Sequence, residues 1–207
     1  MFLENPLNHK EQFGRIEVIC GSMFSGKTEE LIRRLKRAQF ANQKIEIFKP
    51  AIDRRYGDQM VTSHDSNQIH STSVTAAANI PVLANECQVV GIDEAQFFDD
   101  EIVEVCNNLA NQGIRVIIAG LDMDYQGKPF GPMPALMAIA EYVTKVHAIC
   151  TQTGNLAHYS YRKSDQKDLV LLGEKDGYEP LSRVAFHKVL SKDKKKEPKK
   201  NVKKKRS

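Results

Sequence analysis

The sequence predicts an α/β fold in which helices flank a parallel β-sheet. Short apolar runs alternate with a segment of helical period along residues 15–121, and each run is too apolar to leave one face of a strand in water. Parallel strands joined by helices explain both features, because crossover helices cover the two faces of the sheet. Ligands are then expected where the strands end, at the carboxyl edge of the sheet.

Four apolar runs predict the strands of this sheet. Each is rich in Val and Ile and is followed by Gly, Pro or an acidic residue, which ends a strand. The runs are RIEVIC at 15–20, KIEIFKP at 44–50, QVVGID at 88–93 and RVIIAGL at 115–121.

Two segments predict helices. The first begins at Thr28 and the second has Asp99 as its N-cap and ends at Gly113. The first helix is expected to bury one apolar stripe and to expose its basic residues. The stripe is Leu31, Ile32, Leu35 and Ala38, and the basic residues are Arg33, Arg34, Lys36 and Arg37.

Composition divides the chain into four parts. We expect a leader at 1–14, the α/β domain at 15–149, a small β-rich segment at 150–187 and a basic tail at 188–207. A hairpin of AHYSYR with KDLVLLG is predicted in the third part. Of the chain's net charge of +4, the tail carries +9, which leaves −5 for residues 1–187. From Lys192 onward the tail has almost no apolar residue, so we expect it to be disordered.

Several protein classes are excluded by composition. The four cysteines, Cys20, Cys87, Cys106 and Cys150, form no CxxC pair, which excludes a disulfide scaffold. No apolar run approaches the roughly 18 residues that cross a bilayer. The N-terminus also lacks the basic and apolar regions of a secretion signal. We therefore expect a cytoplasmic protein with no membrane contact.

A phosphate-binding loop is the strongest signal in the chain. Between the first strand and the first helix the sequence matches G-x-x-x-x-G-K-[ST]. Backbone N–H groups of such a loop and the helix dipole bind phosphates, the lysine reaches the β- and γ-phosphates, and the hydroxyl of the last residue ligates Mg²⁺. This predicts a P-loop NTPase fold with a RecA-like sheet. The loop is Gly21, Ser22, Met23, Phe24, Ser25, Gly26, Lys27 and Thr28.

A pair of carboxylates follows the third strand. Asp93 is placed to hold Mg²⁺, and Glu94 is then free to accept a proton from the attacking nucleophile or to orient it. These two features predict nucleotide hydrolysis or phosphoryl transfer, and they do not separate the two. Phe97, Tyr125 and Phe130 lie beside the expected phosphate site, where aromatic faces suit a planar base.

Three segments together resemble the type II, cellular thymidine kinases, in their bacterial form. They are GSMFSGKTEEL, VVGIDEAQFF and LDMDYQGKPFG, and the similarity extends from about residue 15 to 187. The resemblance implies transfer of the ATP γ-phosphoryl group to the 5′-hydroxyl of thymidine, with Mg²⁺. It also implies that 150–187 is a substrate-covering lasso subdomain, that the chain forms a homotetramer, and that thymidine triphosphate inhibits it.

The resemblance assigns roles to individual residues. Glu94 is the general base, Asp93 and Thr28 are associated with Mg²⁺, and Lys27 and Arg55 act on the phosphates. Ala95 and Gln96 belong with Asp93 and Glu94 to the nucleotide-binding DEAQ segment. The residues implied to surround the nucleoside are Met23, Phe97, Leu121, Tyr125, Phe130 and Tyr178.

The zinc site of many relatives is not matched. Where they carry two CxxC pairs, this chain has Cys150 with Thr153 and Ser182 with Ala185. One thiolate does not complete a tetrahedral site. We therefore predict no structural zinc, although His147, His158 and His187 leave a substitute site open.

Two alternative functions stay open at this stage. A kinase of another deoxynucleoside, such as deoxyuridine, is one, because a methyl group in an apolar pocket supplies only about 1 to 3 kcal/mol of discrimination. A P-loop ATPase acting on nucleic acid is the other, with the basic tail as its footprint. The acidic balance of residues 1–187 argues against a nucleic-acid partner. Loops 51–73 and 121–131 are expected to form the lid that excludes water.

Overall fold

The computed structural model describes residues 14–52, 60–62, 68–163 and 177–196. The helical elements are α1 (Lys27–Phe40), η1 (Ala77–Asn79), α2 (Ile80–Leu83), η2 (Ala95–Phe97), α3 (Glu101–Asn111), α4 (Met133–Ile139) and α5 (Arg183–Lys196). The strands are β1 (Arg15–Gly21), β2 (Ile45–Pro50), β3 (Met60–Thr62), β4 (Gln68–His70), β5 (Thr72–Val74), β6 (Val89–Ile92), β7 (Arg115–Gly120), β8 (Tyr142–Val146), β9 (Ala148–Ile149), β10 (Leu156–Ala157), β11 (Tyr159–Arg162) and β12 (Tyr178–Leu181).

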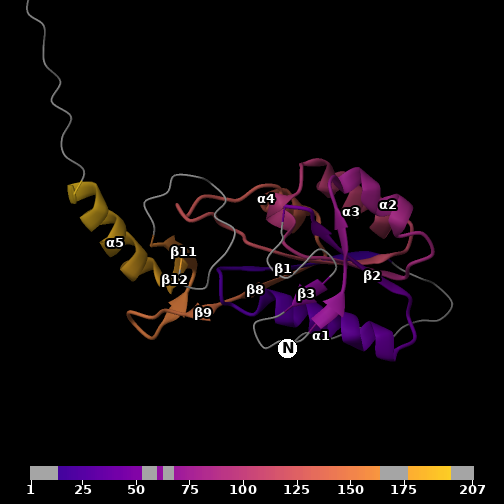
Figure 1. The fold of residues 1–207 in the computed structure, drawn as a ribbon, viewed down its shortest axis with the longest axis horizontal. Coiled ribbons are helices and arrows are strands. Elements are labelled where there is room, and N and C mark those ends of the chain that lie inside the picture. The colour runs from indigo at the N-terminus through magenta and orange to yellow at the C-terminus, as the bar shows by residue number, and fades with distance from the viewer. Residues whose placement is uncertain (1–13, 53–59, 63–67, 164–176, 197–207) are drawn as a thin grey trace, which may run out of the picture.

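Six parallel strands form the central sheet, in the order β5-β2-β6-β7-β1-β8 (Figure 1). This confirms the predicted α/β class and the four predicted strands. The strands β1, β7 and β6 are neighbours, so the loops that leave their carboxyl ends open at one edge of the sheet. The phosphate loop, the DEAQ segment and loop 121–131 are these three loops.

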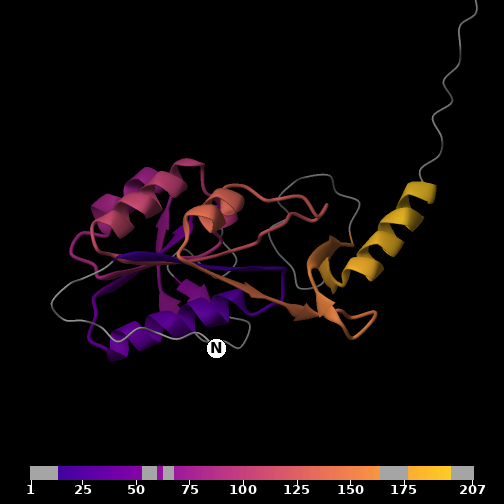
Figure 2. The ribbon, with the colours of Figure 1, turned by 180° about the vertical axis from the view of Figure 1, so that it is seen from behind.

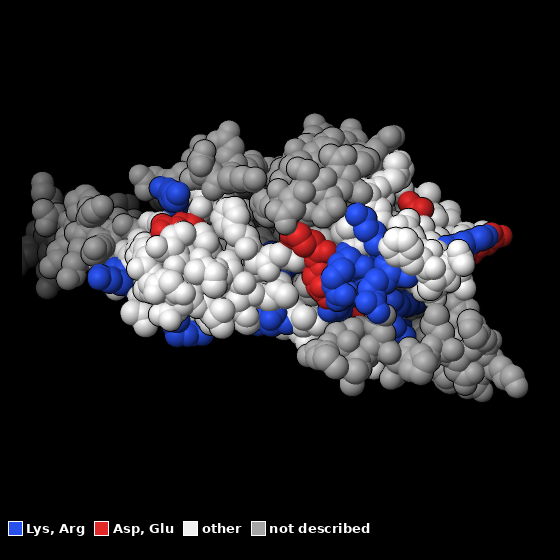
Figure 3. All heavy atoms as spheres, turned by 90° about the horizontal axis from the view of Figure 1, so that it is seen from below, with Lys and Arg blue, Asp and Glu red and all other residues white. Residues whose placement is uncertain are grey.

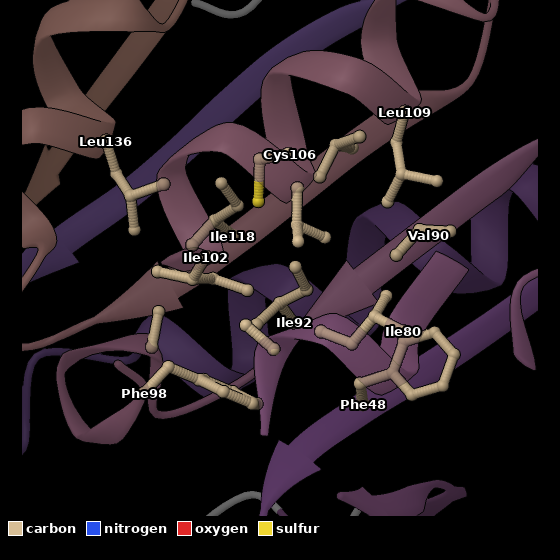
Figure 4. Packing of buried hydrophobic residues seen from close by; sticks show 14 of the residues in the cluster. Phe48, Ile80, Val90, Ile92, Phe98, Ile102, Cys106, Leu109, Ile118 and Leu136 are labelled. Atoms are coloured by element: carbon tan, nitrogen blue, oxygen red, sulfur yellow. The ribbon is translucent and has the colours of Figure 1, made fainter. Parts of the chain in front are cut away.

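Helices cover both faces of the sheet, with α1 on one side and α2, α3 and α4 on the other (Figures 1 and 2). The predicted stripe of α1 is buried and packs on alternate residues of β1 and β7, including Ile19 and Ile117. The opposite face packs against Ile102, Cys106 and Leu109 of α3 (Figure 4). Asp99 is not the N-cap of α3: Asp100 holds that position, and the Asp99 carboxylate accepts a hydrogen bond from the Ala77 N–H instead.

One basic residue of α1 is buried, contrary to the prediction. Arg34 is fully buried and donates hydrogen bonds to Glu17, Glu30 and Thr144. Glu17, on β1, is also fully buried and accepts from Arg115 as well. The sequence pattern missed this because a carboxylate on a neighbouring strand compensates the guanidinium. Figure 3 shows the α1 side, where Lys and Arg side chains gather next to acidic ones.

A small unit follows β8 and lies beyond the end of the sheet (Figures 1 and 2). Its strands pair as β9 with β10 and β11 with β12, both antiparallel, and α5 packs on β11 and β12. The strand β11 pairs with Tyr178–Leu181, which the sequence did not predict as a strand. The predicted partner of AHYSYR, KDLVLLG, lies within residues 164–176, outside the described part of the chain, so that hairpin stays a prediction. The helix α5 extends to Lys196, so residues 192–196 are helical where disorder was expected.

Loop 51–73 is only partly described. It contains β3 and β4, which pair with each other, while residues 53–59 and 63–67 lie outside the described ranges. Its expected role as a lid stays a prediction. Among the described helices, none is long and apolar enough to span a bilayer.

Candidate nucleotide-binding site

The phosphate loop joins β1 to α1, as the motif predicts. At Gly21 φ is +147°, and a Cβ there would lie 2.1 Å from the carbonyl oxygen of Val146 on the neighbouring strand, so only glycine fits. Gly26 is the N-cap of α1 in a left-handed conformation. The first N–H groups of α1 therefore point into the loop, which is the arrangement that binds an anion.

Side chains of the loop also contact its backbone. The Lys27 ammonium group donates to the carbonyl of Ser22 at 2.7 Å, and the Ser25 hydroxyl donates to the same carbonyl at 2.7 Å. The lysine therefore lies across the loop, close to the position that the backbone N–H groups prepare for phosphate. One charge and several N–H donors converge there.

Asp93 lies directly after β6 and faces the start of α1. The Thr28 hydroxyl donates to Oδ2 of Asp93 at 3.4 Å, and Oδ1 accepts from the Glu94 N–H at 3.0 Å. Two hard oxygen ligands are thus side by side, which suits Mg²⁺, an ion that keeps several waters and needs few protein ligands. The described residues contain no group of three or more His, Cys, Asp or Glu able to hold a metal.

Glu94 has a strained backbone and a fixed side chain. Its φ of +51° and ψ of +41° are left-handed, which is costly for a residue with a Cβ and is common at functional sites. The Gln96 amide donates to Oε2 of Glu94 at 2.5 Å, and Oε1 of Gln96 accepts from the Leu121 N–H at 2.8 Å. The Glu94 carboxylate is therefore oriented by Gln96, which is itself held by a hydrogen bond at the end of the neighbouring strand β7.

Loop 121–131 is held by its own polar groups. Oδ1 of Asp124 accepts from the N–H groups of Gln126 and Lys128, and Met123 pairs with Pro129. Its Phe130 ring meets Phe97 edge to face, with centroids 5.6 Å apart. An aromatic pair thus joins the DEAQ segment to this loop.

Through β11, the small unit after β8 contacts both the phosphate loop and loop 121–131. The Met23 N–H donates to Oγ of Ser160 at 2.9 Å. The Arg162 guanidinium lies 3.9 Å from the centre of the Tyr125 ring and donates to the Tyr178 hydroxyl. Arg162 therefore links Tyr125 of loop 121–131 to Tyr178 of β12.

Sequence reasoning missed Ser160 and Arg162. Both belong to AHYSYR, two residues apart, and alternate residues of a strand share a face. That alternation was the sequence signal that could have placed Ser160 and Arg162 on the same face. Among the predicted site residues, Ala95 is fully buried and packs in the core, and Arg55 lies outside the described residues.

The four positions that match the zinc ligands of relatives do not fit zinc. Cys150 and Ala185 share an apolar cluster, and the Thr153 hydroxyl donates to Oγ of Ser182 at 3.2 Å. Burial raises the pKa of the Cys150 thiol, but hydrogen bonds from Thr153, Ser182 and Gln152 outweigh burial and lower this pKa to about 6. One sulfur in a shell of hydroxyl and N–H donors does not supply tetrahedral zinc ligands.

The three histidines proposed for a substitute zinc site do not gather into one cluster. His147 and His158 meet edge to face with centroids 4.7 Å apart, while His187 packs against Tyr159 and Phe186. Among the described residues these side chains do not join Cys150 in a metal-binding group.

Comparison with known proteins agrees with the motifs. The family profile described as thymidine kinase matches residues 14–186. A thymidine kinase of Bacteroides fragilis strain YCH46 is 59% identical over 196 residues, which are 95% of this chain and 98% of that protein. Thymidine kinases of Porphyromonas gingivalis strain W83 and Rhodothermus sp. strain ITI 518 are each 58% identical, over 89% and 87% of this chain and 91% and 84% of their own lengths. The resemblance is confirmed, and the chain belongs to the thymidine kinase family.

Proposed function

We propose that the chain transfers the γ-phosphoryl group of ATP to the 5′-hydroxyl of thymidine, giving thymidine monophosphate and ADP. The carrying observation is the position of Glu94, a carboxylate oriented by Gln96 at the sheet edge where the phosphate loop opens. A hydrolase has no need of a nucleoside pocket next to such a carboxylate. Here Phe97, directly after the DEAQ segment, packs edge to face on Phe130, and Tyr125 of the same loop 121–131 stacks on Arg162.

ATP binding is assigned to the phosphate loop. Its N–H groups and the Lys27 ammonium offset the charge of the β- and γ-phosphates. Thr28 and Asp93 would hold Mg²⁺, which, when bound, neutralises charge on the phosphate oxygens. Arg55 is proposed to assist Lys27 at the phosphates.

Glu94 is proposed to accept the proton of the 5′-hydroxyl. A hydroxyl group is a poor nucleophile at neutral pH, so a carboxylate within hydrogen-bond reach lowers the barrier as the new P–O bond forms. The Gln96 amide donates to Oε2 of Glu94, which orients the carboxylate for this task.

The nucleoside is proposed to lie among Met23, Phe97, Tyr125 and the neighbouring residues Leu121, Phe130 and Tyr178. Met23 is the proposed contact of the thymine methyl group. That methyl group contributes about 1 to 3 kcal/mol in an apolar pocket, so deoxyuridine is expected to be a poorer substrate that is still phosphorylated.

Further properties that the family implies are also proposed: a homotetramer, inhibition by thymidine triphosphate and a cytoplasmic location. An assembly is supported by the edge strand β8, on which Tyr142 and Val143 are exposed. An apolar strand at a sheet edge tends to pair with another chain. Ile149 and Leu156, which pair across β9 and β10, are exposed as well.

Product analysis tests the proposed reaction. The protein is incubated with Mg²⁺ and ATP and with thymidine, deoxyuridine, deoxycytidine, deoxyadenosine or deoxyguanosine in turn. We expect thymidine monophosphate as the main product and a slower reaction with deoxyuridine. ADP without any phosphorylated nucleoside, especially ADP release stimulated by nucleic acid, would replace this proposal by the nucleic-acid ATPase.

A further inference from the structure

We propose that Arg162 is a positioning residue that clamps Tyr125 and Tyr178 together and so shapes the nucleoside side of the site. The inference rests on the proposed function and deepens it. It concerns a residue that no motif of the sequence singles out.

The strand β11 presents two faces with different tasks. Tyr159 stacks on Phe186 with ring centroids 4.3 Å apart, which fixes one face on the small unit's own core. Ser160 and Arg162 share the other face, because side chains two residues apart in a strand point the same way. Ser160 accepts a hydrogen bond from the Met23 N–H of the phosphate loop. The face that carries Arg162 is therefore directed at the nucleotide site.

Arg162 contacts two tyrosines from different segments. Its guanidinium carbon lies 3.9 Å from the centre of the Tyr125 ring, which belongs to loop 121–131. Its Nη2 and Nε donate to the hydroxyl of Tyr178 at 2.8 and 3.2 Å. Arg162 and Tyr178 are also direct cross-strand partners in the β11–β12 pair. The planar guanidinium of Arg162 thus stacks on the Tyr125 ring and forms hydrogen bonds with the Tyr178 hydroxyl.

The cost of this arrangement argues for a specific role. Arg162 is 4% exposed, and removing a guanidinium from water is expensive unless its environment compensates. An aliphatic side chain would pack on β11 at lower cost. Stacking on an aromatic face together with forked donation is a combination that arginine provides and lysine does not.

Loss of the Arg162 contacts is expected to affect nucleoside binding and to leave ATP binding unchanged. Tyr125 and Tyr178 are proposed nucleoside contacts, and neither belongs to the phosphate loop. Loss of the clamp leaves both rings free to separate, so the site must order them each time thymidine binds. We therefore expect the KM for thymidine to rise while the KM for ATP stays close to that of the wild type.

The test uses the full chain, with four single variants, one of them a control, and one double variant. Arg162→Met removes the clamp and keeps a long side chain, Arg162→Lys keeps the charge without the planar fork, and Tyr178→Phe removes the hydroxyl to which Arg162 donates. Arg183→Met is the matched control, because Arg183 also lies over an aromatic ring, 5.3 Å from the centre of Tyr159, on the other face of β11. Each protein is measured for thermal unfolding, for kcat, and for the KM of thymidine and of ATP.

We expect Arg162→Met to raise the KM for thymidine about tenfold or more, since bonds between charged and neutral groups are among the stronger ones. Arg162→Lys should not restore it, and Arg183→Met should resemble the wild type. The double variant with Tyr178→Phe should raise the KM by less than the product of the two single effects, because both single variants lose the Arg162–Tyr178 bond.

Three results overturn the proposal. They are an unchanged KM for thymidine in Arg162→Met, full rescue by lysine, and an equal rise of both KM values together with a lower melting temperature. A wild-type chain that neither binds nor phosphorylates thymidine contradicts the proposed function itself. An active wild type with a normal Arg162→Met variant contradicts the clamp alone.

Discussion

The Gln96 side-chain amide donates a hydrogen bond to Oε2 of Glu94 at 2.5 Å. The same side chain accepts from the Leu121 N–H, at the end of the neighbouring strand β7. Gln96 is buried, so this link is shielded from competing water. The proposed base follows β6, and Gln96 links it by hydrogen bonds to the end of β7. The turn that contains Glu94 would not fix its side chain alone.

Replacing Gln96 with Leu should lower kcat for thymidine about ten- to a hundredfold, because a misplaced proton acceptor loses its geometry with the nucleophile. Steady-state kinetics measures the effect. Gln112→Leu, an exposed glutamine at the end of α3, is the control and should leave kcat unchanged. Normal turnover in the Gln96 variant would show that Glu94 needs no such orientation.

Replacing Gly131 with Ala should reduce both stability and kcat. At φ of +50° an added Cβ would lie 2.4 Å from the carbonyl oxygen of Gln96. Gly154→Ala is the matched control, since φ there is +69° with no atom within 4 Å of the added Cβ. Both variants lose about 1 kcal/mol or more from left-handed strain, and only Gly131→Ala adds a clash beside Glu94. Equal melting temperatures and equal kcat for the two variants would contradict this.

Replacing Glu17 with Gln should destabilise the fold by about 3 to 5 kcal/mol, since it removes the buried carboxylate that Arg34 and Arg115 share. Urea unfolding measures the change. Glu86→Gln, in an exposed pair with Lys44, should have little effect and is the control. A small effect at both positions would mean that the buried network contributes no more than a surface pair.

The Glu17 contribution also depends on pH. Burial raises the pKa of this carboxyl, and the hydrogen bonds and charges of Arg115 and Arg15 outweigh burial, so the folded pKa is below its ordinary value. The stability it supplies is thus present above the unfolded pKa and is lost as the pH falls through the folded one. The difference between wild type and Glu17→Gln should shrink in acid.

The Cys150 thiol predicts a second pH dependence, near neutrality. Its folded pKa is lowered from 9.0 to about 6, so its contribution is full above the unfolded pKa and declines as the pH falls toward 6. The stability difference between wild type and Cys150→Ala should therefore grow between pH 6 and 8 in reducing buffer. Cys106→Ala is the control, because burial raises the Cys106 pKa to about 12 and this thiol stays neutral throughout. Parallel behaviour of the two variants would contradict a thiolate at Cys150.

Metal analysis checks the associated prediction that the protein holds no structural zinc. Purified protein should contain far less than one zinc per chain, and chelation should leave its melting temperature unchanged. Stoichiometric zinc that survives chelation and dialysis would contradict this prediction.

The sequence predicted the elements whose burial is complete. β1, β6 and β7 are buried along their length, so Val and Ile runs identified them. The edge strand β8 was missed because none of its residues is fully buried: three are exposed and two are half-buried. The pairing of β11 with β12 was not predicted, because β12 contains Pro180 and is not typical of a strand.

The site shows the same division. The phosphate loop and the two carboxylates follow from local sequence, because each motif lies within one strand-loop segment. Arg162 and Ser160 act across segments far apart in the chain, and their partners depend on how β11 docks against the sheet edge. Likewise, the burial of Arg34 depends on Glu17 of another element.

The most direct test of the account is a comparison of wild type and Glu94→Gln, in which ATP binding and the rate of thymidine monophosphate formation are both measured. Glutamine keeps the shape of the side chain but does not accept the proton of the 5′-hydroxyl at neutral pH. We predict ATP binding close to that of the wild type and a kcat at least about a hundredfold lower, the contribution typical of a general base. A Glu94→Gln variant that binds ATP and turns over thymidine at the wild-type rate would contradict the assignment of Glu94 as the proton acceptor.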